Sequence, residues 1–549
     1  MLTAGAILIK SLEQQGVDRL FCVPGESYLP VLDALQDSVI EVVLARHEGG
    51  AAMMAEADGK MTGRPGIALV TRGPGASNAA SGIHVAQQDS TPLIVFIGQV
   101  ARDMRGRDAF QEVDYHQFFG GMAKWVAEVE QADDLAATIE QAYITAMEGR
   151  PGPVVISLPE DMLYEEASSA IPARVSITRP APAIDAITTA RSMLEGAERP
   201  MVIAGGSVWD DGSIADLSRF AASFGVPVAC SFRRQRLMNN LDPHYAGDLG
   251  LGCNPALLER IRGSDCLILL GGRLSEIPSQ SYTLLDIPSP QMPLIHVHPS
   301  SGELGRVYTP TLGIETSPGA FLTAMMQGRE VTTGAKPMPE HQSWQDWNNA
   351  IPAPPGPVNM AEIVRWLREN LPDDSIITNG AGNYATWAHR FYHYRDPMSQ
   401  LSPTSGSMGY GIPAAVAAKA RFPQRTVIAF AGDGCFQMTM QEMATARQIG
   451  ANIIVLVVDN GMYGTIRMHQ EREFPGRVRH TELINPDFVP LAESMGAYAE
   501  KVLDTATFAD AFKRCLKAGR PALLHLPIDP EAISPTTTLS AIRQRSLNP

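Results

Sequence analysis

Short apolar runs rich in β-branched residues alternate along most of the chain with longer stretches in which apolar positions recur at helical spacing. Such runs are typical of strands buried on both faces, and the stretches between them are typical of helices. The alternation predicts an α/β fold of doubly wound parallel sheets with helices on both faces. The expected strands are Arg19–Val23, Ile40–Ala45, Gly66–Thr71, Pro92–Gly98 and Pro153–Leu158, then Pro200–Ala204, Pro227–Cys230, Cys266–Leu270 and Pro293–Val297, and finally Ser375–Thr378, Thr426–Phe430, Asn452–Val458 and Ala522–Leu526.

Two stretches without periodicity, Ser168 to Pro182 and Thr332 to Pro357, divide this pattern into three blocks. Their proline content and lack of apolar spacing are typical of linkers. A chain of 549 residues is also too long for one hydrophobic core. We therefore expect three consecutive domains, at residues 1–165, 183–330 and 358–530. The clearest expected helices are Gly49–Met61, Ala76–Gln88 and Phe436–Gln448.

Composition narrows the possible partners. The net charge of −15 disfavours binding to nucleic acid or to an anionic membrane, since both need an excess of Lys and Arg. The apolar runs are far shorter than a membrane span, and Met1 to Arg19 resembles an amphipathic helix more than a signal peptide. The six cysteines form no metal-binding spacing, which favours a reducing compartment. We expect a cytoplasmic protein.

The strongest candidate for a binding site directly follows the expected strand Thr426–Phe430. Ala431-Gly432-Asp433-Gly434 leads from that strand into an expected helix, and glycines at such a turn let the backbone approach a ligand closely. The free N–H groups at the start of the helix favour a phosphate. Ligands of doubly wound sheets bind beyond the carboxyl ends of the strands, where Asp433 is expected.

The next expected strand ends in Asp459-Asn460-Gly461-Met462-Tyr463. If the two strands are neighbours, Asn460 lies at the same sheet edge as Asp433. Mg²⁺ prefers oxygen ligands in octahedral geometry and shares them with phosphates. Asp433, the side-chain oxygen of Asn460 and a carbonyl near Met462 would be its protein ligands. A plain turn and a helix cap are the structural alternative.

This arrangement resembles the cofactor motif of the family of acetolactate synthases, pyruvate oxidases and 2-oxoacid decarboxylases. The family motif usually ends in Asn-Asn, whereas this chain has Asp459-Asn460. The resemblance implies that the chain binds thiamine diphosphate through Mg²⁺. It also implies that the three domains are a pyrimidine-binding, a central and a diphosphate-binding domain.

The resemblance extends to the first block. Arg46-His47-Glu48-Gly49-Gly50 is similar to the stretch that carries the catalytic glutamate of the family, whose carboxylate promotes proton loss from the cofactor. An ordinary first-turn Glu stabilised by the helix dipole is the structural alternative for Glu48. The resemblance also implies that residues in loops near Glu48 and before the phosphate motif bind the cofactor. These are Pro24, Gly25, Gly73, Gly75, Gly406 and Met408, in addition to Gly432, Gly434, Met462 and Tyr463.

Substrate-binding residues are less clearly marked. Asp108 to Asp114 resembles the acetolactate synthase stretch in which a Phe and a Gln, here Phe110 and Gln111, border the substrate pocket. His469 stands near the place where biosynthetic synthases carry a Trp, which implies another substrate or acceptor. His116 is a candidate proton relay, because imidazole titrates near neutrality, and His84 is a weaker one. Surface or core histidines are the structural alternative.

The expected central domain carries arginines and glycine pairs of uncertain role. Arg233, Arg234, Arg236 and Arg273 could bind a carboxylate or a phosphate, but a solvated face is the expected reading. Flavin-containing relatives bind FAD in this domain. Gly205-Gly206 and Gly271-Gly272 are compatible with that but form no GxGxxG pattern, so FAD is left open and its absence favoured.

The expected activity is decarboxylation of a 2-oxoacid, dependent on thiamine diphosphate and Mg²⁺, followed by carboligation. A non-ligating 2-oxoacid decarboxylase, of benzoylformate or pyruvate type, is the alternative. A cofactor-binding homologue without chemistry is an alternative of another class. In the family, Glu48 and Asp433 of one site would come from different subunits, which implies at least a homodimer and favours a homotetramer with interfacial active sites.

Overall fold

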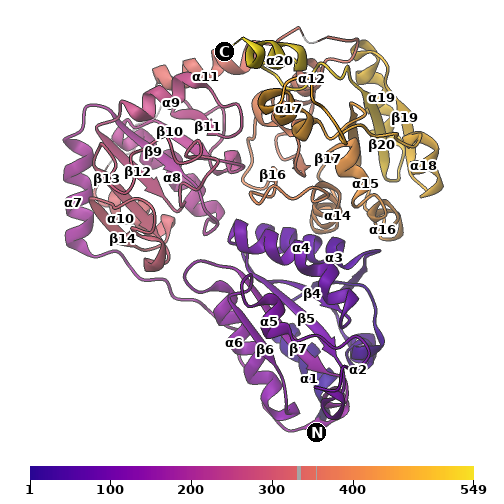
Figure 1. The fold of residues 1–549 in the computed structure, drawn as a ribbon. Coiled ribbons are helices and arrows are strands. Elements are labelled where there is room, and N and C mark those ends of the chain that lie inside the picture. The colour runs from indigo at the N-terminus through magenta and orange to yellow at the C-terminus, as the bar shows by residue number, and fades with distance from the viewer. Residues whose placement is uncertain (330–335, 354, 549) are drawn as a thin grey trace. The chain divides into compact units, whose positions relative to one another are not determined.

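The computed structural model describes residues 1–329, 336–353 and 355–548. Within these residues the chain forms three parallel sheets of six strands each, together with a short antiparallel pair of β1 (Leu2–Thr3) and β8 (Glu166–Ala167). Helices flank each of the three sheets (Figure 1). The expected α/β fold of three doubly wound parallel sheets is confirmed, whereas the domain boundaries remain a prediction.

The described chain divides into two compact units. The first, here the N-terminal unit, contains Met1–Thr178 and two later segments, Pro403–Pro423 and Thr439–Ala451. The second, here the C-terminal unit, contains Arg179–Ser402, Gln424–Met438 and Asn452–Pro549.

The sheet of the N-terminal unit has the strand order β3-β2-β4-β5-β7-β6. A core of buried residues fills the face covered by α1, α2 and α6, while α3 and α4 pack on the other face (Figure 1). The strands are β2 (Arg19–Cys22), β3 (Glu41–Leu44), β4 (Gly66–Val70), β5 (Leu93–Gln99), β6 (Trp125–Glu128) and β7 (Pro153–Pro159), and the helices are α1 (Ala4–Gln14), α2 (Leu29–Ala34), α3 (Glu48–Thr62), α4 (Pro74–Asp89) and α6 (Leu135–Met147).

Helices α14 (Gly411–Arg421) and α16 (Glu442–Gln448) come from the last third of the sequence but belong to the N-terminal unit. A buried polar network ties the segment before α14 to α3 and α4. Lys60 forms ion pairs with Glu56 and Asp89. The Tyr410 hydroxyl donates to Glu56 at 2.6 Å, and the Thr404 amide donates to Asp89 at 2.7 Å.

The central sheet, in the C-terminal unit, has the order β11-β10-β9-β12-β13-β14. Alternate side chains of its strands enter two different cores. Val202 and Ala204 pack with α7, α8 and α10, whereas Met201 and Ile203 pack with α9. The elements are β9 (Pro200–Ala204), β10 (Val228–Ser231), β11 (Tyr245–Leu249), β12 (Cys266–Leu270), β13 (Leu294–His298), β14 (Leu312–Glu315), α7 (Ile184–Glu195), α8 (Asp211–Phe224), α9 (Pro255–Arg262) and α10 (Pro318–Met326).

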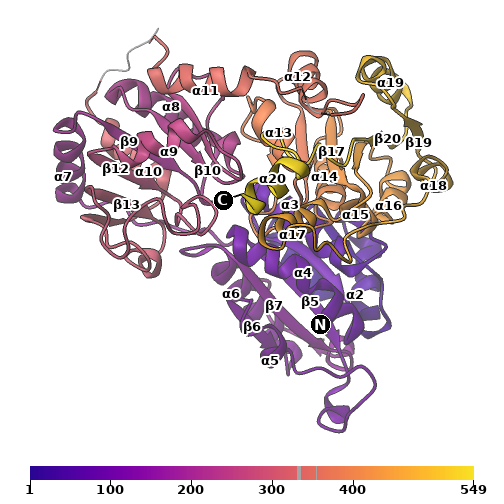
Figure 2. The same cartoon turned by 45° about the horizontal axis from the view of Figure 1, so that its top comes forward.

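The third sheet, also in the C-terminal unit, has the order β16-β15-β17-β18-β20-β19. Its strands are β15 (Ile376–Asn379), β16 (Gln400–Leu401), β17 (Val427–Gly432), β18 (Ile454–Asp459), β19 (Tyr498–Lys501) and β20 (Ala522–Pro527). Helix α20 (Leu539–Leu547) packs against α17 (Gly464–Glu473), close to the carboxyl-terminal end of the sheet (Figure 2).

Two sequence expectations are wrong in part. The second expected linker, Thr332 to Pro357, contains helix α11 (Pro339–Asn349), and Trp344 on that helix is buried in the central core. Its residues 332–335 and 354 lie outside the described residues. The expected helix Phe436–Gln448 is two helices, α15 (Asp433–Gln437) and α16, whose segments fall in different units.

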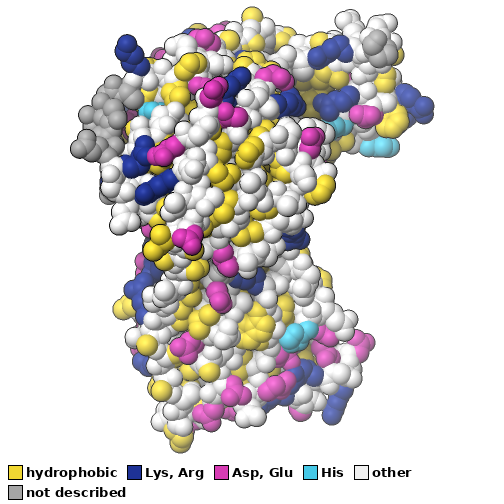
Figure 3. Space-filling view, turned by 90° about the vertical axis from the view of Figure 1, so that its left-hand side faces the viewer, with side chains coloured by type: hydrophobic (Ala, Val, Ile, Leu, Met, Phe, Trp, Pro, Cys, Tyr) yellow, Lys and Arg dark blue, Asp and Glu magenta, His cyan; other side chains and the backbone are white. Residues whose placement is uncertain are grey.

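Charged side chains of both signs are interspersed on the face shown in Figure 3, and acidic ones gather toward its lower end. No helix among the described residues combines the length and the apolar character needed to span a membrane.

Candidate active site

Strands β17 and β18 are neighbours in the third sheet and run parallel, with Gly432 paired to Val458. Asp433 and Asn460 therefore follow adjacent strands at the same carboxyl edge, as the sequence predicts. Asp433 is also the first residue of α15, so it lies where a strand gives way to the amino end of a helix.

The Asp433 carboxylate is almost fully buried. Burial raises its pKa to about 6, and the neighbouring Asp459 carboxylate adds to the rise. Asn485 donates from its amide nitrogen to Asp433 at 2.8 Å and to Asp459 at 2.9 Å. Gln437 donates to the Asn485 carbonyl oxygen at 3.0 Å, which fixes the orientation of that amide. Two carboxylates held this close would be stabilised by a bound cation.

The oxygens of Asn460 and Met462 are available to a ligand. The half-buried side chain of Asn460 makes no hydrogen bond within the described part of the chain. Met462 faces Glu482 in an isolated antiparallel bridge whose hydrogen bonds are made by its neighbours, from Tyr463 N–H to Thr481 and from Leu483 N–H to Gly461. The Met462 carbonyl therefore points away from the bridge.

Tyr463 packs against the turn at Gly434. A Cβ atom on Gly434 would lie 2.7 Å from the Tyr463 ring, so only glycine leaves this turn as it is. Gly432 is similarly confined, because its Cβ would lie 2.8 Å from the ring of Tyr384. The two glycines thus keep the amino end of α15 clear of side chains.

Asp459, where this chain departs from the usual Asn-Asn, has partners of its own. His525 on β20 approaches one carboxylate oxygen with its Nε2 at 2.8 Å, and the Gly461 amide donates to the other at 2.9 Å. Burial alone would raise the pKa of Asp459, but these hydrogen bonds outweigh it and hold the pKa below its ordinary value. Asp459 therefore links the loop that follows β18 to the neighbouring strand β20.

Glu48 is the first residue of α3, in the N-terminal unit. The His47 ring caps this helix by accepting the Gly49 amide at 3.0 Å. Asn78 on α4 donates to the Glu48 carboxylate at 3.0 Å. A Cβ on Gly75 would lie 3.3 Å from that carboxylate, so Gly75 leaves room for it. The Glu48 side chain is half-buried at the start of α3.

Sequence reasoning missed Glu442, which supports this turn from α16. Its carboxylate accepts the backbone N–H of Arg46 through both oxygens, each at 3.2 Å, and the Thr445 hydroxyl at 2.6 Å. Glu442 is fully buried, and burial raises its pKa. The role of Glu442 follows only from its contact with Arg46, which lies far away in the sequence.

Gln111 lies against the turn at Gly73. A Cβ on Gly73 would lie 2.8 Å from the Gln111 Cβ, and the Gly73 amide donates to the Tyr115 hydroxyl at 3.0 Å. Gly73 and Gln111 both have positive φ, of 57° and 66°. For Gln111, a non-glycine residue, this conformation is strained.

The other expected site residues of the N-terminal unit lie in loops or on the surface. Pro24 and Gly25 follow β2, and Gly25 packs against Thr71. Gly406 and the half-buried Met408 lie in the loop before α14. The side chains of Phe110, His116 and His84 are exposed, so the structure gives these three no buried catalytic setting.

Comparison with known proteins decides the family. Residues 2–118, 187–325 and 380–526 match the models for the N-terminal TPP binding domain, the central domain and the C-terminal TPP binding domain of thiamine pyrophosphate enzymes. The chain is 31% identical to the acetolactate synthase of Mycobacterium bovis over 94% of its own length and 87% of that protein. This chain belongs to the thiamine pyrophosphate enzyme family.

Further relatives are also named as acetolactate synthase subunits. The large subunit of acetolactate synthase isozyme 2 from Escherichia coli is 29% identical over 95% of both chains. The mitochondrial acetolactate synthase catalytic subunit of Saccharomyces cerevisiae is 29% identical over 96% of this chain and 81% of that protein. The protein is thus an acetolactate synthase-like enzyme that depends on thiamine diphosphate, which is the same compound as thiamine pyrophosphate.

In this thiamine pyrophosphate enzyme the arginines after β10 do not form a solvated face. Arg233, Arg234 and Arg236 are all at most 8% exposed. Arg233 donates to the Gly380 carbonyl at 3.0 Å, and Arg234 donates to the Gly206 carbonyl at 2.9 Å. The expectation of a solvated face is wrong because a second sheet of the same unit covers this segment.

The glycine pairs of the central sheet have a packing role. The loops after β9 and β12 touch, so that a Cβ on Gly206 would collide with the Gly271 carbonyl. Gly206 has a φ of 79°, and Gly271 has one of 76°. Close approach of two loops therefore explains these glycines without a nucleotide.

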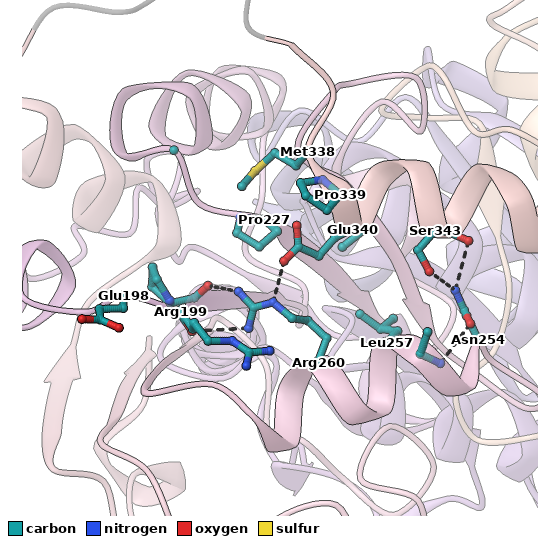
Figure 4. Close-up of a pocket in the computed structure, with 14 residues that line it drawn as sticks. Glu198, Arg199, Pro227, Asn254, Leu257, Arg260, Met338, Pro339, Glu340 and Ser343 are labelled. Atoms are coloured by element: carbon teal, nitrogen blue, oxygen red, sulfur yellow. Dashed lines mark hydrogen bonds and ion pairs between the residues drawn. The ribbon is translucent and has the colours of Figure 1, made fainter.

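A pocket of about 470 Å³ opens at the opposite, amino-terminal edge of the central sheet, beside Pro200 and Pro227 (Figure 4). Arg260 donates to Glu340 at 2.5 Å and to the Pro200 carbonyl at 2.9 Å across it. Asn254 donates to the Ser343 hydroxyl at 3.2 Å. Much of the polar lining is thus engaged in contacts within the protein.

Proposed function

We propose that this enzyme decarboxylates a 2-oxoacid with thiamine diphosphate and Mg²⁺ and then transfers the remaining fragment to a second carbonyl compound. The observation that carries the proposal is the carboxyl edge of β17 and β18. There a buried carboxylate, an unengaged amide oxygen and an unengaged carbonyl follow adjacent strands. This set of oxygen ligands suits Mg²⁺ bound to a diphosphate.

Each residue has a defined part in the proposal. Asp433, Asn460 and the Met462 carbonyl bind Mg²⁺, and the N–H groups at the start of α15 receive phosphate oxygens. Asn485 holds the Asp433 carboxylate in place by hydrogen bonding. The Asp459–His525 pair fixes the loop that carries Asn460.

Glu48 is proposed as the proton-handling carboxylate at the pyrimidine end of the cofactor. When bound, thiamine diphosphate supplies the thiazolium carbon that adds to the substrate carbonyl and takes up the electron pair left by CO₂. Glu48 exchanges a proton with the aminopyrimidine ring, and Asn78 orients its carboxylate. Pro24, Gly25, Gly73, Gly75, Gly406 and Met408 are proposed to line the same ring.

Ligation is favoured over simple decarboxylation by Gln111 and by the relatives. Gln111 packs on Gly73 in a strained backbone conformation, at the place of the acetolactate synthase stretch that borders the substrate. The curated relatives quoted above are named acetolactate synthases. A non-ligating decarboxylase would give free aldehyde instead.

Product analysis tests this proposal. Purified holoenzyme is incubated with a panel of 2-oxoacids, and the products are identified by mass spectrometry. The expected result is CO₂ with 2-hydroxyketone or 2-hydroxy-2-alkyl-3-oxoacid products. Glu48→Gln should lower kcat at least about a hundredfold while cofactor binding persists. Free aldehyde alone would support the decarboxylase, and full turnover by the variant would refute the role of Glu48.

Removal of the metal tests the ligand set. Chelation of divalent cations should abolish cofactor binding, and Mg²⁺ should restore it. Asp433→Asn should weaken cofactor affinity by about tenfold or more, measured by fluorescence quenching of the protein. Asp487→Asn, at an exposed cap of a helix in the same unit, is the matched control. Unchanged affinity after chelation would rule out the proposed site.

We also propose that active sites form at the interface of a homodimer, within a homotetramer, with Glu48 and Asp433 from different subunits. Co-expression of Glu48→Gln and Asp433→Asn chains distinguishes this from a site within one chain. Random pairing gives half heterodimers with one intact site each, so activity should return to about a quarter of the wild-type value. No recovery would contradict shared sites.

FAD is not part of the proposed mechanism. The glycines after β9 and β12 are occupied by contacts with one another, which supports a flavin-free central domain. A purified preparation should show no flavin absorbance in the visible range, and stoichiometric FAD would overturn this part of the proposal.

A further inference from the structure

A second cavity, of about 580 Å³, lies in the C-terminal unit between α13 (Ala385–Phe391), α17 and α20. It is large enough for a small organic ligand. Leu251, Met468 and Ile542 give it an apolar part. Its polar lining is rich in hydroxyl groups, from Thr386, Thr465, Ser534, Thr536, Thr537 and Ser546.

One face of α17 lines this cavity. Thr465, Met468, His469 and Arg472 all contribute to the lining, and their spacing places them on the same side of a helix. Helix α17 begins two residues after Met462, which is a proposed metal ligand. Thr465 in the lining is three residues from Met462, so the cavity begins close to the loop that carries the proposed metal ligands, and His469 lies in its wall.

The arginines of α17 and α20 fall into two groups, one paired with a carboxylate and one that lines the cavity. On one side, Arg467 and Arg543 both form ion pairs with Glu471, whose side chain is fully buried. The hydrogen bonds from Arg543 in particular lower the pKa of Glu471 to about 2. These two arginines are therefore neutralised by a carboxylate that stays ionised at neutral pH.

On the cavity side, Arg472 and Arg545 have no such carboxylate. Neither forms an ion pair within the described residues. Arg545 donates to the Thr537 hydroxyl at 2.5 Å, which directs its guanidinium along the cavity wall. No Asp or Glu is among the residues that line the cavity.

Arg390 adds a third positive charge from α13. Its guanidinium stacks on the Trp347 ring at 3.9 Å and donates to the carbonyls of Trp347 and Ala350 at 3.0 and 3.2 Å. Burial lowers its pKa to about 10, so it remains charged at neutral pH. Its Nε atom is buried and has no hydrogen-bond partner.

We propose that this cavity binds a second carboxylate of the substrate, distant from the reacting carbonyl, so that the enzyme prefers 2-oxo dicarboxylic acids. Three arginines without a counter-carboxylate form a binding site for an anion. The apolar side chains of the lining suit a short methylene chain. The inference rests on the proposed function and specifies its substrate class.

The test compares 2-oxoglutarate with 2-oxopentanoate, which has a methyl group in place of the second carboxylate. The wild-type enzyme should show at least about tenfold higher kcat/KM for 2-oxoglutarate. R472Q/R545Q should raise KM for 2-oxoglutarate at least about tenfold, change its kcat less than about twofold, and leave 2-oxopentanoate unaffected. The matched control is R477Q/R479Q, which removes the same charge from exposed residues outside the cavity.

Binding to an inactive holoenzyme separates this inference from the proposed function. Calorimetric titration of E48Q with 2-oxoglutarate should show at least about tenfold weaker binding when R472Q/R545Q is added. Arg-dependent binding without turnover of any 2-oxoacid by the wild type would support the anion site and refute the proposed activity. Turnover of both acids with no effect of R472Q/R545Q would overturn the inference and leave the activity intact.

Discussion

The carboxylate of Glu442 accepts the backbone N–H of Arg46 through both oxygens, although 396 positions separate the two residues in the chain. Arg46 precedes Glu48 by two residues, so this contact fixes the turn that presents the proposed catalytic carboxylate. A Cβ on Gly50 would collide with Glu442, which shows how closely α16 approaches the start of α3. Glu442 therefore acts as a positioning residue.

Removal of that acceptor should reduce activity more than it reduces stability. Glu442→Ala leaves the Arg46 amide without its acceptor and the Thr445 hydroxyl with only the Leu44 carbonyl, at 3.3 Å. The kcat should fall about tenfold or more with little change in KM. Glu442→Gln keeps one acceptor oxygen and should recover part of the loss. Gln448→Ala removes only the contact with the Arg46 side chain and serves as the control. Equal activity of all three variants would refute the positioning role.

The buried network around Lys60 should be essential for stability. Lys60→Met leaves the carboxylates of Glu56 and Asp89 buried without their cation, which should cost about 3–5 kcal/mol in the free energy of unfolding. Urea denaturation measures the loss, and Lys10→Met, on the exposed side of α1, should change it by less than about 0.5 kcal/mol. Addition of Asp89→Asn to Lys60→Met should restore part of the stability. A Lys60→Met protein as stable as the wild type would show that the network is not essential.

Replacement of Asp459 by the residue usual in the family should separate metal binding from loop packing. Asp459→Asn loses the charge that faces His525, and stability should fall by about 1–2 kcal/mol. Affinity for Mg²⁺ and cofactor should change less than about threefold, because Asn460 supplies the proposed ligand. Thermal denaturation and cofactor titration measure the two effects. A large loss of affinity would instead make Asp459 itself a metal ligand.

The mostly buried carboxyl of Asp248 should make stability depend on pH. Burial raises its pKa to about 7, against about 3.8 in the unfolded chain. The folded state therefore holds a proton that the unfolded state releases, and stability falls as pH rises from about 4 to 7, by up to about 4 kcal/mol. Asp248→Asn removes this dependence, so the difference in Tm between variant and wild type should grow with pH and level off above pH 7. A constant difference would contradict the buried neutral form.

The expected strands that the structure contains are mostly the inner strands of the three sheets. The strands of these three sheets that the sequence prediction lacks, β6, β11, β14, β16 and β19, all stand at a sheet edge. An edge strand has a neighbour on one side only and needs no continuous apolar run. In β19, for example, no residue is fully buried. Hydrophobic pattern therefore identifies the interior of a parallel sheet better than its border.

Local motifs indicated Asp433, Asn460 and Glu48 because each stands at a strand-to-helix turn with glycines beside it. Contacts between segments far apart in the chain have no local sequence motif that would predict them. Glu442, Asn485 and His525 contribute through partners 396, 52 and 66 positions away. The sequence predicts a solvated face for the arginines after β10 for the same reason, because the sheet that covers them comes later in the chain.

The N-terminal unit is not continuous in sequence, and this bears on how the protein is made. A ribosome that has completed residue 178 must add 225 more residues to reach Pro403, which takes about 10–50 s at ordinary rates of translation. During that time α3 and α4 lack α14, and Lys60 lacks Tyr410. The nascent chain then exposes surface that only its own last third can cover, which makes this interval the stage at which chaperone binding would matter most.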